Sequence, residues 1–117
     1  MAVVIYGIKN CNTMQKAFKW LDNHDISYQF HDYKKEGIDK KQLQQFIDTF
    51  GWQNVINRKG MTWRKLTKKE QENVNDNSSA IELMVQKPAM IKRPIITTDN
   101  NHLIGFDEDE YKKTLSN

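Results

Sequence analysis

The apolar positions at the start of the chain follow two different periods. Residues Ala2 to Tyr6 form a continuous apolar run, which predicts a buried strand. Between Asn12 and His24 the apolar residues recur every three or four positions, which predicts a helix. Residues 28–31 alternate between apolar and polar and predict a second strand. A strand, a helix and a strand in such close succession indicate a right-handed βαβ unit with parallel strands.

The middle of the chain has helical periodicity and three residue pairs with the spacing of capping boxes. The pairs are Asp39 with Gln42, Thr67 with Glu70, and Ser79 with Glu82. The first precedes a helix with apolar residues up to Phe50, and the last opens a helix that ends before Pro88. The polar residues 73–79 predict a loop between helices.

The final third predicts a hairpin and one more helix. Residues 95–98 and 102–105 read as strands, and the short polar connection between them favours antiparallel pairing. Asp107 is placed to cap a final helix with Tyr111 and Leu115 on one face. We therefore expect an α/β fold with a four-stranded mixed sheet. A helical insertion over roughly residues 38–90 would separate its βαβ and ββα halves, all in one domain spanning 1–117.

Composition narrows the classes of partner. The net charge of +3 on 117 residues is mild, so we expect no direct nucleic-acid partner. No apolar run approaches the ~20 residues that span a bilayer, so we expect no membrane association. The single cysteine cannot form an internal disulfide, and the chain starts without the pattern of a signal peptide. We expect a cytoplasmic protein.

Cys11 is the candidate for chemistry, because it lies where the strand pattern gives way to the helix pattern. The unpaired amides and the dipole at a helix start favour anions, and therefore thiolate over thiol. Lys9 and Lys16 add positive charge nearby, and Asn12 and Thr13 can hydrogen-bond. The alternative is a small, inert residue packed at the end of a strand, as many free cysteines are.

Two arginines and the histidines complete the set of candidate residues. Arg58, in a turn, and Arg93, before Pro94, are suited to bidentate binding of anions, although surface solvation is the alternative for each. The sequence does not choose between a cis and a trans Arg93–Pro94 bond. The histidines lack metal-ligand spacing, so we expect no metal and no bound cofactor: His24, His31 and His102.

The chain resembles the arsenate reductase-like (ArsC/Spx/YffB) family of thioredoxin-like proteins over nearly its whole length. The resemblance rests on the order and spacing of short motifs: Ile5–Gly7 with Cys11–Thr13, His31–Lys34, Asn57-Arg58, Ala80–Met84 and Met90–Ile95. It is most similar to the YffB subgroup, whose members are proposed glutathione-dependent thiol reductases. The resemblance implies a thioredoxin-like fold, Cys11 as redox nucleophile, Arg58 and Arg93 as anion-site residues, and a cis bond at Pro94.

Departures from the family pattern separate its branches. Arsenate reductases of this family carry a histidine four residues before the cysteine and an arginine four residues after it, where this chain has Gly7 and Gln15. Their third anion-site arginine aligns with Gly105. The Spx branch carries a Cys-x-x-Cys switch, and Met14 stands here in place of its second cysteine.

The resemblance and the residues together predict a glutathione-dependent thiol–disulfide reductase. Cys11 would be the nucleophile, and Lys16, Arg58 and Arg93 would hold carboxylates of glutathione, the expected co-substrate. Glutaredoxin is a candidate partner, and we expect a monomer. The alternative is an Spx-like regulator that binds RNA polymerase without turnover, which exposed tryptophans at positions 20, 52 and 63 would favour. Arsenate reduction is a lesser alternative.

Overall fold

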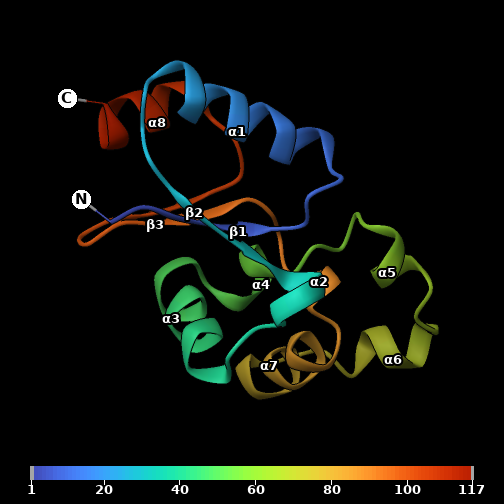
Figure 1. Cartoon of the computed structure of the whole chain (residues 1–117). Coiled ribbons are helices and arrows are strands. Elements are labelled where there is room, and N and C mark those ends of the chain that lie inside the picture. The colour runs from blue at the N-terminus through green and yellow to red at the C-terminus, as the bar shows by residue number, and fades with distance from the viewer. Residues whose placement is uncertain (1, 117) are drawn as a thin grey trace. The chain divides into compact units, whose positions relative to one another are not determined.

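Four strands form one sheet in the order β2-β1-β3-β4 in the computed structural model, which describes residues 2–116. The strands are β1 (Val4–Gly7), β2 (Gln29–Asp32), β3 (Ile95–Thr97) and β4 (His102–Ile104) (Figure 1). β1 and β2 run parallel, with Ile5 opposite Phe30, whereas β3 is antiparallel to both β1 and β4. The predicted mixed sheet and its C-terminal hairpin are confirmed.

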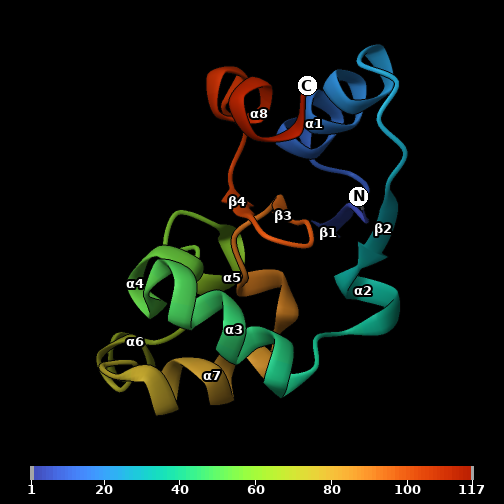
Figure 2. The ribbon, with the colours of Figure 1, turned by 90° about the vertical axis from the view of Figure 1, so that its left-hand side faces the viewer.

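Two helices cover one face of this sheet. α1 (Asn12–Asn23) and α8 (Glu108–Leu115) lie on the same side of the strands in both Figure 1 and Figure 2. The alternation of β1 and β3 directs buried Ile5 and Ile96 toward the helices, because successive residues of a strand face opposite sides. Their helical partners in this core are Met14, Ala17, Trp20, Leu21, Tyr111 and Leu115.

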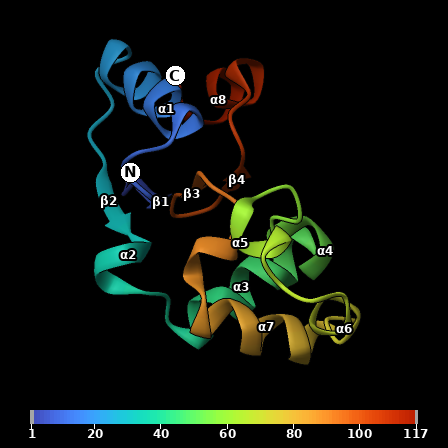
Figure 3. The same ribbon diagram turned by 90° about the vertical axis from the view of Figure 1, so that its right-hand side faces the viewer.

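The described residues up to Tyr33 and from Arg93 onward form one compact unit, which contains the sheet with α1 and α8. Residues Lys34–Lys92 form a second unit, in which α2 (Tyr33–Glu36) ends. Its other helices, drawn in green to orange in Figure 3, are α3 (Lys40–Phe50), α4 (Trp52–Val55), α5 (Met61–Arg64), α6 (Lys68–Glu72), α7 (Asn77–Gln86) and the 3-10 turn η1 (Pro88–Met90). The assignment of the whole chain to a single domain stays a prediction.

The second unit is held together by an apolar core and a short backbone pairing. An isolated antiparallel bridge joins Ile56 to Ile91, with hydrogen bonds from Asn57 N to Met90 O and from Lys92 N to Val55 O, both 2.7 Å long. The residues buried in this core include Leu43, Phe46, Ile47, Val55, Ala80, Met84 and Met90. They come from α3, α4, α7 and η1, so the apolar periodicity of these segments accounts for the packing.

Helix ends agree with the sequence in three places and differ in one. Asp39, Thr67 and Asp107 are the N-cap residues of α3, α6 and α8, and Thr67 forms a full capping box with Glu70. The prediction that Ser79 caps a helix was wrong. Asp76 is the N-cap of α7 and accepts from Ser79 N at 2.8 Å, while Ser79 Oγ accepts from Asp76 N at 3.2 Å.

Two smaller differences concern a helix cap and a strand. Asp39 does not form a full box with Gln42, because its side chain accepts from Lys41 N, at 3.4 Å, rather than from the Gln42 amide. The first strand begins at Val4 and reaches Gly7, two residues later and one residue further than the apolar run predicted. Within residues 2–116, no helix has the length and apolar character needed to cross a membrane.

Candidate functional site

Cys11 lies at the junction between β1 and α1 (Figure 1) and is the N-cap residue of the helix. Its backbone is extended, with φ −139° and ψ 132°, and its carbonyl accepts the first helical hydrogen bond from Gln15 N at 2.9 Å. The thiol is free and half-buried. The predicted position of the cysteine at a helix start is therefore where the structure has it.

The surroundings of the sulfur favour the thiolate. Partial burial raises the pKa of the Cys11 thiol, but the backbone amides of Met14 and Thr13 and the guanidinium of Arg93 together bring that pKa below its ordinary value. The Cys11 side chain makes no capping hydrogen bond. The amides therefore act mainly on the charged form, which is the stronger acceptor.

Arg93 reaches the site from the residue before β3. The guanidinium lies within hydrogen-bonding reach of the Cys11 sulfur and stabilises its negative charge. The following Arg93–Pro94 peptide bond is cis, as the family resemblance implied and the sequence alone left open. The carbonyl of Pro94 accepts a hydrogen bond from Gly105 N at 2.8 Å, which joins this segment to the end of β4.

Gly7 lies against Met14, which belongs to the apolar cluster that Cys11 packs against. A β-carbon on Gly7 would collide with Sδ and Cε of Met14 and would lie 3.3 Å from Cβ of Arg93. Met14 is fully buried, so its side chain has little freedom to retreat. Glycine at position 7 therefore allows the first turn of α1 and the Arg93 segment to approach β1 together.

Tyr33 is a site-adjacent residue that the sequence analysis did not single out. Its hydroxyl is buried without a hydrogen-bond partner. Burial raises the pKa of Tyr33 strongly and Tyr6 raises it further, while Arg93 opposes both. Arg93 thus interacts with the Tyr33 hydroxyl as well as with Cys11. The sequence signal that could have indicated Tyr33 is the group of aromatic residues on and just after β1 and β2. The ring of Tyr6 lies 4.9 Å from that of His31 and 6.5 Å from that of Tyr33.

The remaining predicted residues near Cys11 differ in their roles. Lys9 is exposed, and its carbonyl accepts from Gln15 Nε2 at 2.8 Å, which ties the loop to α1. Lys16 is also exposed and borders a surface hollow that it shares with Trp20 and Phe106. Neither lysine is among the groups that lower the pKa of Cys11. Asn12 is exposed and Thr13 is half-buried; the contribution of Thr13 comes from its backbone amide.

Arg58 belongs to the second unit, where two tryptophans hold its side chain. Its guanidinium carbon lies 5.4 Å from the ring centre of Trp52 and 6.0 Å from that of Trp63, within cation–π range. Both rings are half-buried, whereas Trp20 is buried in the core of the first unit. Two of the three tryptophans therefore remain accessible to a partner.

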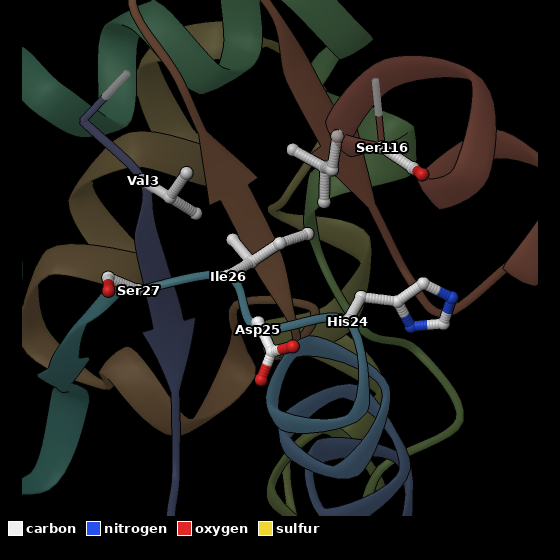
Figure 4. A pocket seen from close by; sticks show the side chains of 7 residues that line it. Val3, His24, Asp25, Ile26, Ser27 and Ser116 are labelled. Carbon is white, nitrogen blue, oxygen red and sulfur yellow. The ribbon is translucent and has the colours of Figure 1, made fainter.

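A separate hollow of about 400 Å³ lies at the far end of α1 (Figure 4). Its lining includes Val3, Ile26, Ser27 and Leu115, together with His24. His24 Nδ1 is 2.8 Å from the carbonyl of Trp20, and the two rings stack with centroids 3.9 Å apart. The histidine is thus accounted for by its helix. Within residues 2–116, no three His, Cys, Asp or Glu side chains are grouped as a metal site.

The sequence profile of the ArsC family matches residues 6–114. The chain belongs to the ArsC family. An uncharacterized protein of Haemophilus influenzae is 42% identical over 114 residues, which cover 97% of this chain and 99% of that relative. A solved structure of a protein named YFFB is 46% identical, has a TM-score of 0.93, and covers 97% of this chain and 99% of that one.

A regulatory relative is also similar to this ArsC-family chain. The global transcriptional regulator Spx of Streptococcus agalactiae is 27% identical over 115 residues, which cover 97% of this chain and 82% of Spx. The predicted family and the α/β, thioredoxin-like fold are therefore confirmed. Members with different roles share this fold, so the role of this chain has to be argued from its own residues.

Proposed function

We propose that this ArsC-family protein is a glutathione-dependent thiol–disulfide reductase with Cys11 as its nucleophile. The observation that carries the proposal is the position of Cys11 at the start of α1, where the Met14 and Thr13 amides and the Arg93 guanidinium together lower the pKa of the thiol. A thiolate that is partly accessible to solvent is the form that attacks disulfides.

The reaction needs two exchange steps. The Cys11 thiolate attacks one sulfur of a disulfide, the S–S bond breaks, and the other sulfur leaves as a thiolate that takes a proton from water. The mixed disulfide on Cys11 is then attacked by a glutathione thiolate, which restores the Cys11 thiolate. This second exchange releases a disulfide that joins the glutathione to the sulfur that Cys11 had carried. With a glutathionylated substrate that disulfide is oxidised glutathione, and its two glutathione units supply the two electrons. An external thiol is required because the chain has no second cysteine.

The arginines supply the binding interactions in this proposal. Arg93 is placed to neutralise negative charge that develops on sulfur, and Arg58 and Lys16 are proposed ligands for the carboxylates of glutathione. We propose a cytoplasmic location, because a lone thiol of this kind needs a reducing compartment. We also propose that the protein is a monomer. Glutaredoxin is the proposed partner if a protein, rather than free glutathione, releases the mixed disulfide.

The second candidate function is a regulator without turnover, and the similarity to Spx over 97% of the chain supports it. Met14 stands in place of the second cysteine of the Spx-type Cys-x-x-Cys pattern, which weighs against an internal disulfide switch. Arsenate reduction is the weaker candidate. Gln15 uses its side chain to bind the Lys9 carbonyl, and Met14 occupies the space that a side chain at position 7 would need.

The direct experiment follows reduction of a glutathionylated peptide in the presence of reduced glutathione. The wild-type protein should give turnover and a transient glutathione adduct on Cys11 in intact-protein mass spectra, and Cys11→Ser should give neither. Lys112→Ala, an exposed change on α8, is the matched control and should behave as wild type. No turnover and no adduct with folded wild-type protein would refute the reductase and leave the regulator.

A further inference from the structure

The second unit carries an arginine whose guanidinium lies over two tryptophan rings. The Arg58 guanidinium contacts both Trp52 and Trp63. Met61, one turn of α5 away from Arg64, is 70% exposed, and within residues 2–116 no other large apolar side chain is exposed. Tryptophan and arginine dominate binding energy at protein interfaces, and methionine adapts to irregular apolar surfaces.

The mild net charge of the chain conceals a strongly basic segment around this cluster. Residues 58–69 contain six Lys or Arg and no Asp or Glu, and all six basic side chains are exposed. The rest of the chain has twelve Lys and Arg against fifteen Asp and Glu, a net charge of −3. The positive charge of the protein is therefore concentrated on residues 58–69, which together with Trp52 we call the basic–aromatic surface.

Local folding does not account for this charge. Lys68 and Lys69 are the first two residues of α6, at the end of a helix where the dipole favours acidic side chains. The capping box of Thr67 and Glu70 already closes that helix end. Lys68 therefore gains nothing from the helix dipole. Its closeness in sequence to Arg64 and Lys65 gives a like-charge segment that an anionic partner would neutralise.

We propose that the basic–aromatic surface binds an acidic protein segment that carries a bulky apolar side chain. The six cations attract Asp and Glu residues of the partner, and exposed Met61 with the edges of Trp52 and Trp63 receives its apolar anchor. A single-stranded nucleic acid fits less well, because base stacking needs free aromatic faces and Arg58 lies over one face of each tryptophan.

The test measures binding of a fluorescein-labelled peptide made of Asp and Glu with one central Phe, by anisotropy at low salt. The same peptide with Asn and Gln in place of the acids tests the charge requirement, and an oligothymidine tests nucleic acid. Arg64→Glu/Lys65→Glu reverses charge within the surface. Lys112→Glu/Lys113→Glu makes the same change on exposed positions of α8 and is the matched control.

The acidic peptide should bind, and binding should weaken with salt and with Asn and Gln replacing its acids. Arg64→Glu/Lys65→Glu should lose affinity by about tenfold, while the α8 control should lose less than about twofold. Met61→Ala should weaken the acidic peptide but not a peptide whose Phe is replaced by Gly. Quenching or shift of tryptophan emission on binding would place the peptide at Trp52 and Trp63, because Trp20 is buried elsewhere.

Three results would overturn the proposal. They are equal peptide binding by the two charge-reversed variants, tighter binding of oligothymidine than of the peptide, and self-association that Arg64→Glu/Lys65→Glu abolishes, which would assign the surface to a second copy. The rate of Cys11 alkylation is measured on every variant. It should stay at the wild-type value, so a failure here is distinguishable from a failure of the reductase proposal.

Discussion

The side chain of Met14 lies against the α-carbon of Gly7, in the volume that any side chain at position 7 would occupy. The two residues are therefore coupled. In the arsenate reductases that this chain resembles, a histidine stands at the position of Gly7. A histidine could not enter here while Met14 remains, so this departure from that pattern has a steric reason.

This coupling predicts a non-additive effect on stability. Gly7→Ala should lower the free energy of unfolding by about 1–3 kcal/mol, the usual cost of overpacking. Met14→Ala should cost about 2–5 kcal/mol, because it leaves a cavity in the core. In the double variant the Gly7→Ala cost should shrink, since the clashing atoms are gone. Thermal and urea unfolding of the four proteins measure the cycle, and strict additivity would contradict the coupling.

A second prediction concerns two buried tyrosines with different hydroxyl environments. Tyr111 donates to the carbonyl of Gly105 at 2.7 Å, whereas the Tyr33 hydroxyl has no hydrogen-bond partner. Tyr111→Phe should therefore destabilise the protein by about 1 kcal/mol. Tyr33→Phe should be neutral or stabilising, because it removes a buried polar group whose hydrogen bond is not made. Urea unfolding distinguishes the two, and equal losses in both variants would contradict this account of the hydroxyls.

The corrected start of α7 gives a third prediction. The amide and hydroxyl of Ser79 lower the pKa of Asp76. Because the folded-state pKa is depressed, this cap stabilises the protein above the ordinary pKa of Asp and is lost as pH falls through the lowered value. Asp76→Ala should reduce the melting temperature at neutral pH. Asp76→Asn should keep most of the cap and remove this acid dependence, so equal behaviour of the two variants would argue against the cap.

The capping predictions show which helix ends could be predicted from local sequence and which could not. Thr67 with Glu70 and Ser79 with Glu82 have the same spacing, yet only the first pair forms a box. Asp76 is the N-cap of the second helix instead of Ser79. The Asp76 carboxylate accepts a hydrogen bond from Ser79 N, and Ser79 Oγ accepts one from Asp76 N. A pattern confined to four residues does not contain that competition. The helix from Asn12, by contrast, was predictable from its apolar periodicity.

The candidate site was predictable only in part, for a similar reason. Local sequence placed Cys11 at a helix start, where the Thr13 and Met14 amides act on it. The contact with Arg93 joins segments far apart in the chain, so only the family resemblance implied it. The expected influence of Lys9 and Lys16 followed from proximity in sequence. Neither lysine is among the groups that lower the pKa of Cys11, and both side chains are exposed. Closeness in sequence does not fix the direction of an exposed side chain.

A fourth prediction links the thiol to stability. The folded-state pKa of Cys11 lies below that of the unfolded chain, so ionisation favours folding above the unfolded-state pKa, and this gain is lost as pH falls through the folded-state value. The stability of the wild type relative to Cys11→Ser should therefore rise with pH across that window. Screening of a partly exposed thiol keeps the rise on the order of a few tenths of a kcal/mol. Chemical unfolding at several pH values measures it, and a fall with increasing pH would contradict the sign.

The Met14 and Thr13 amides and Arg93 lower the pKa of Cys11, and the pH dependence of Cys11 alkylation measures this effect. Iodoacetamide reacts with the thiolate, and the chain has no other cysteine to contribute. The rate for wild-type protein should reach half its maximum at a pH below the ordinary thiol pKa of about 8.5, and Arg93→Ala should move that midpoint upward. A wild-type midpoint at or above the ordinary value, unchanged by Arg93→Ala, would contradict the account.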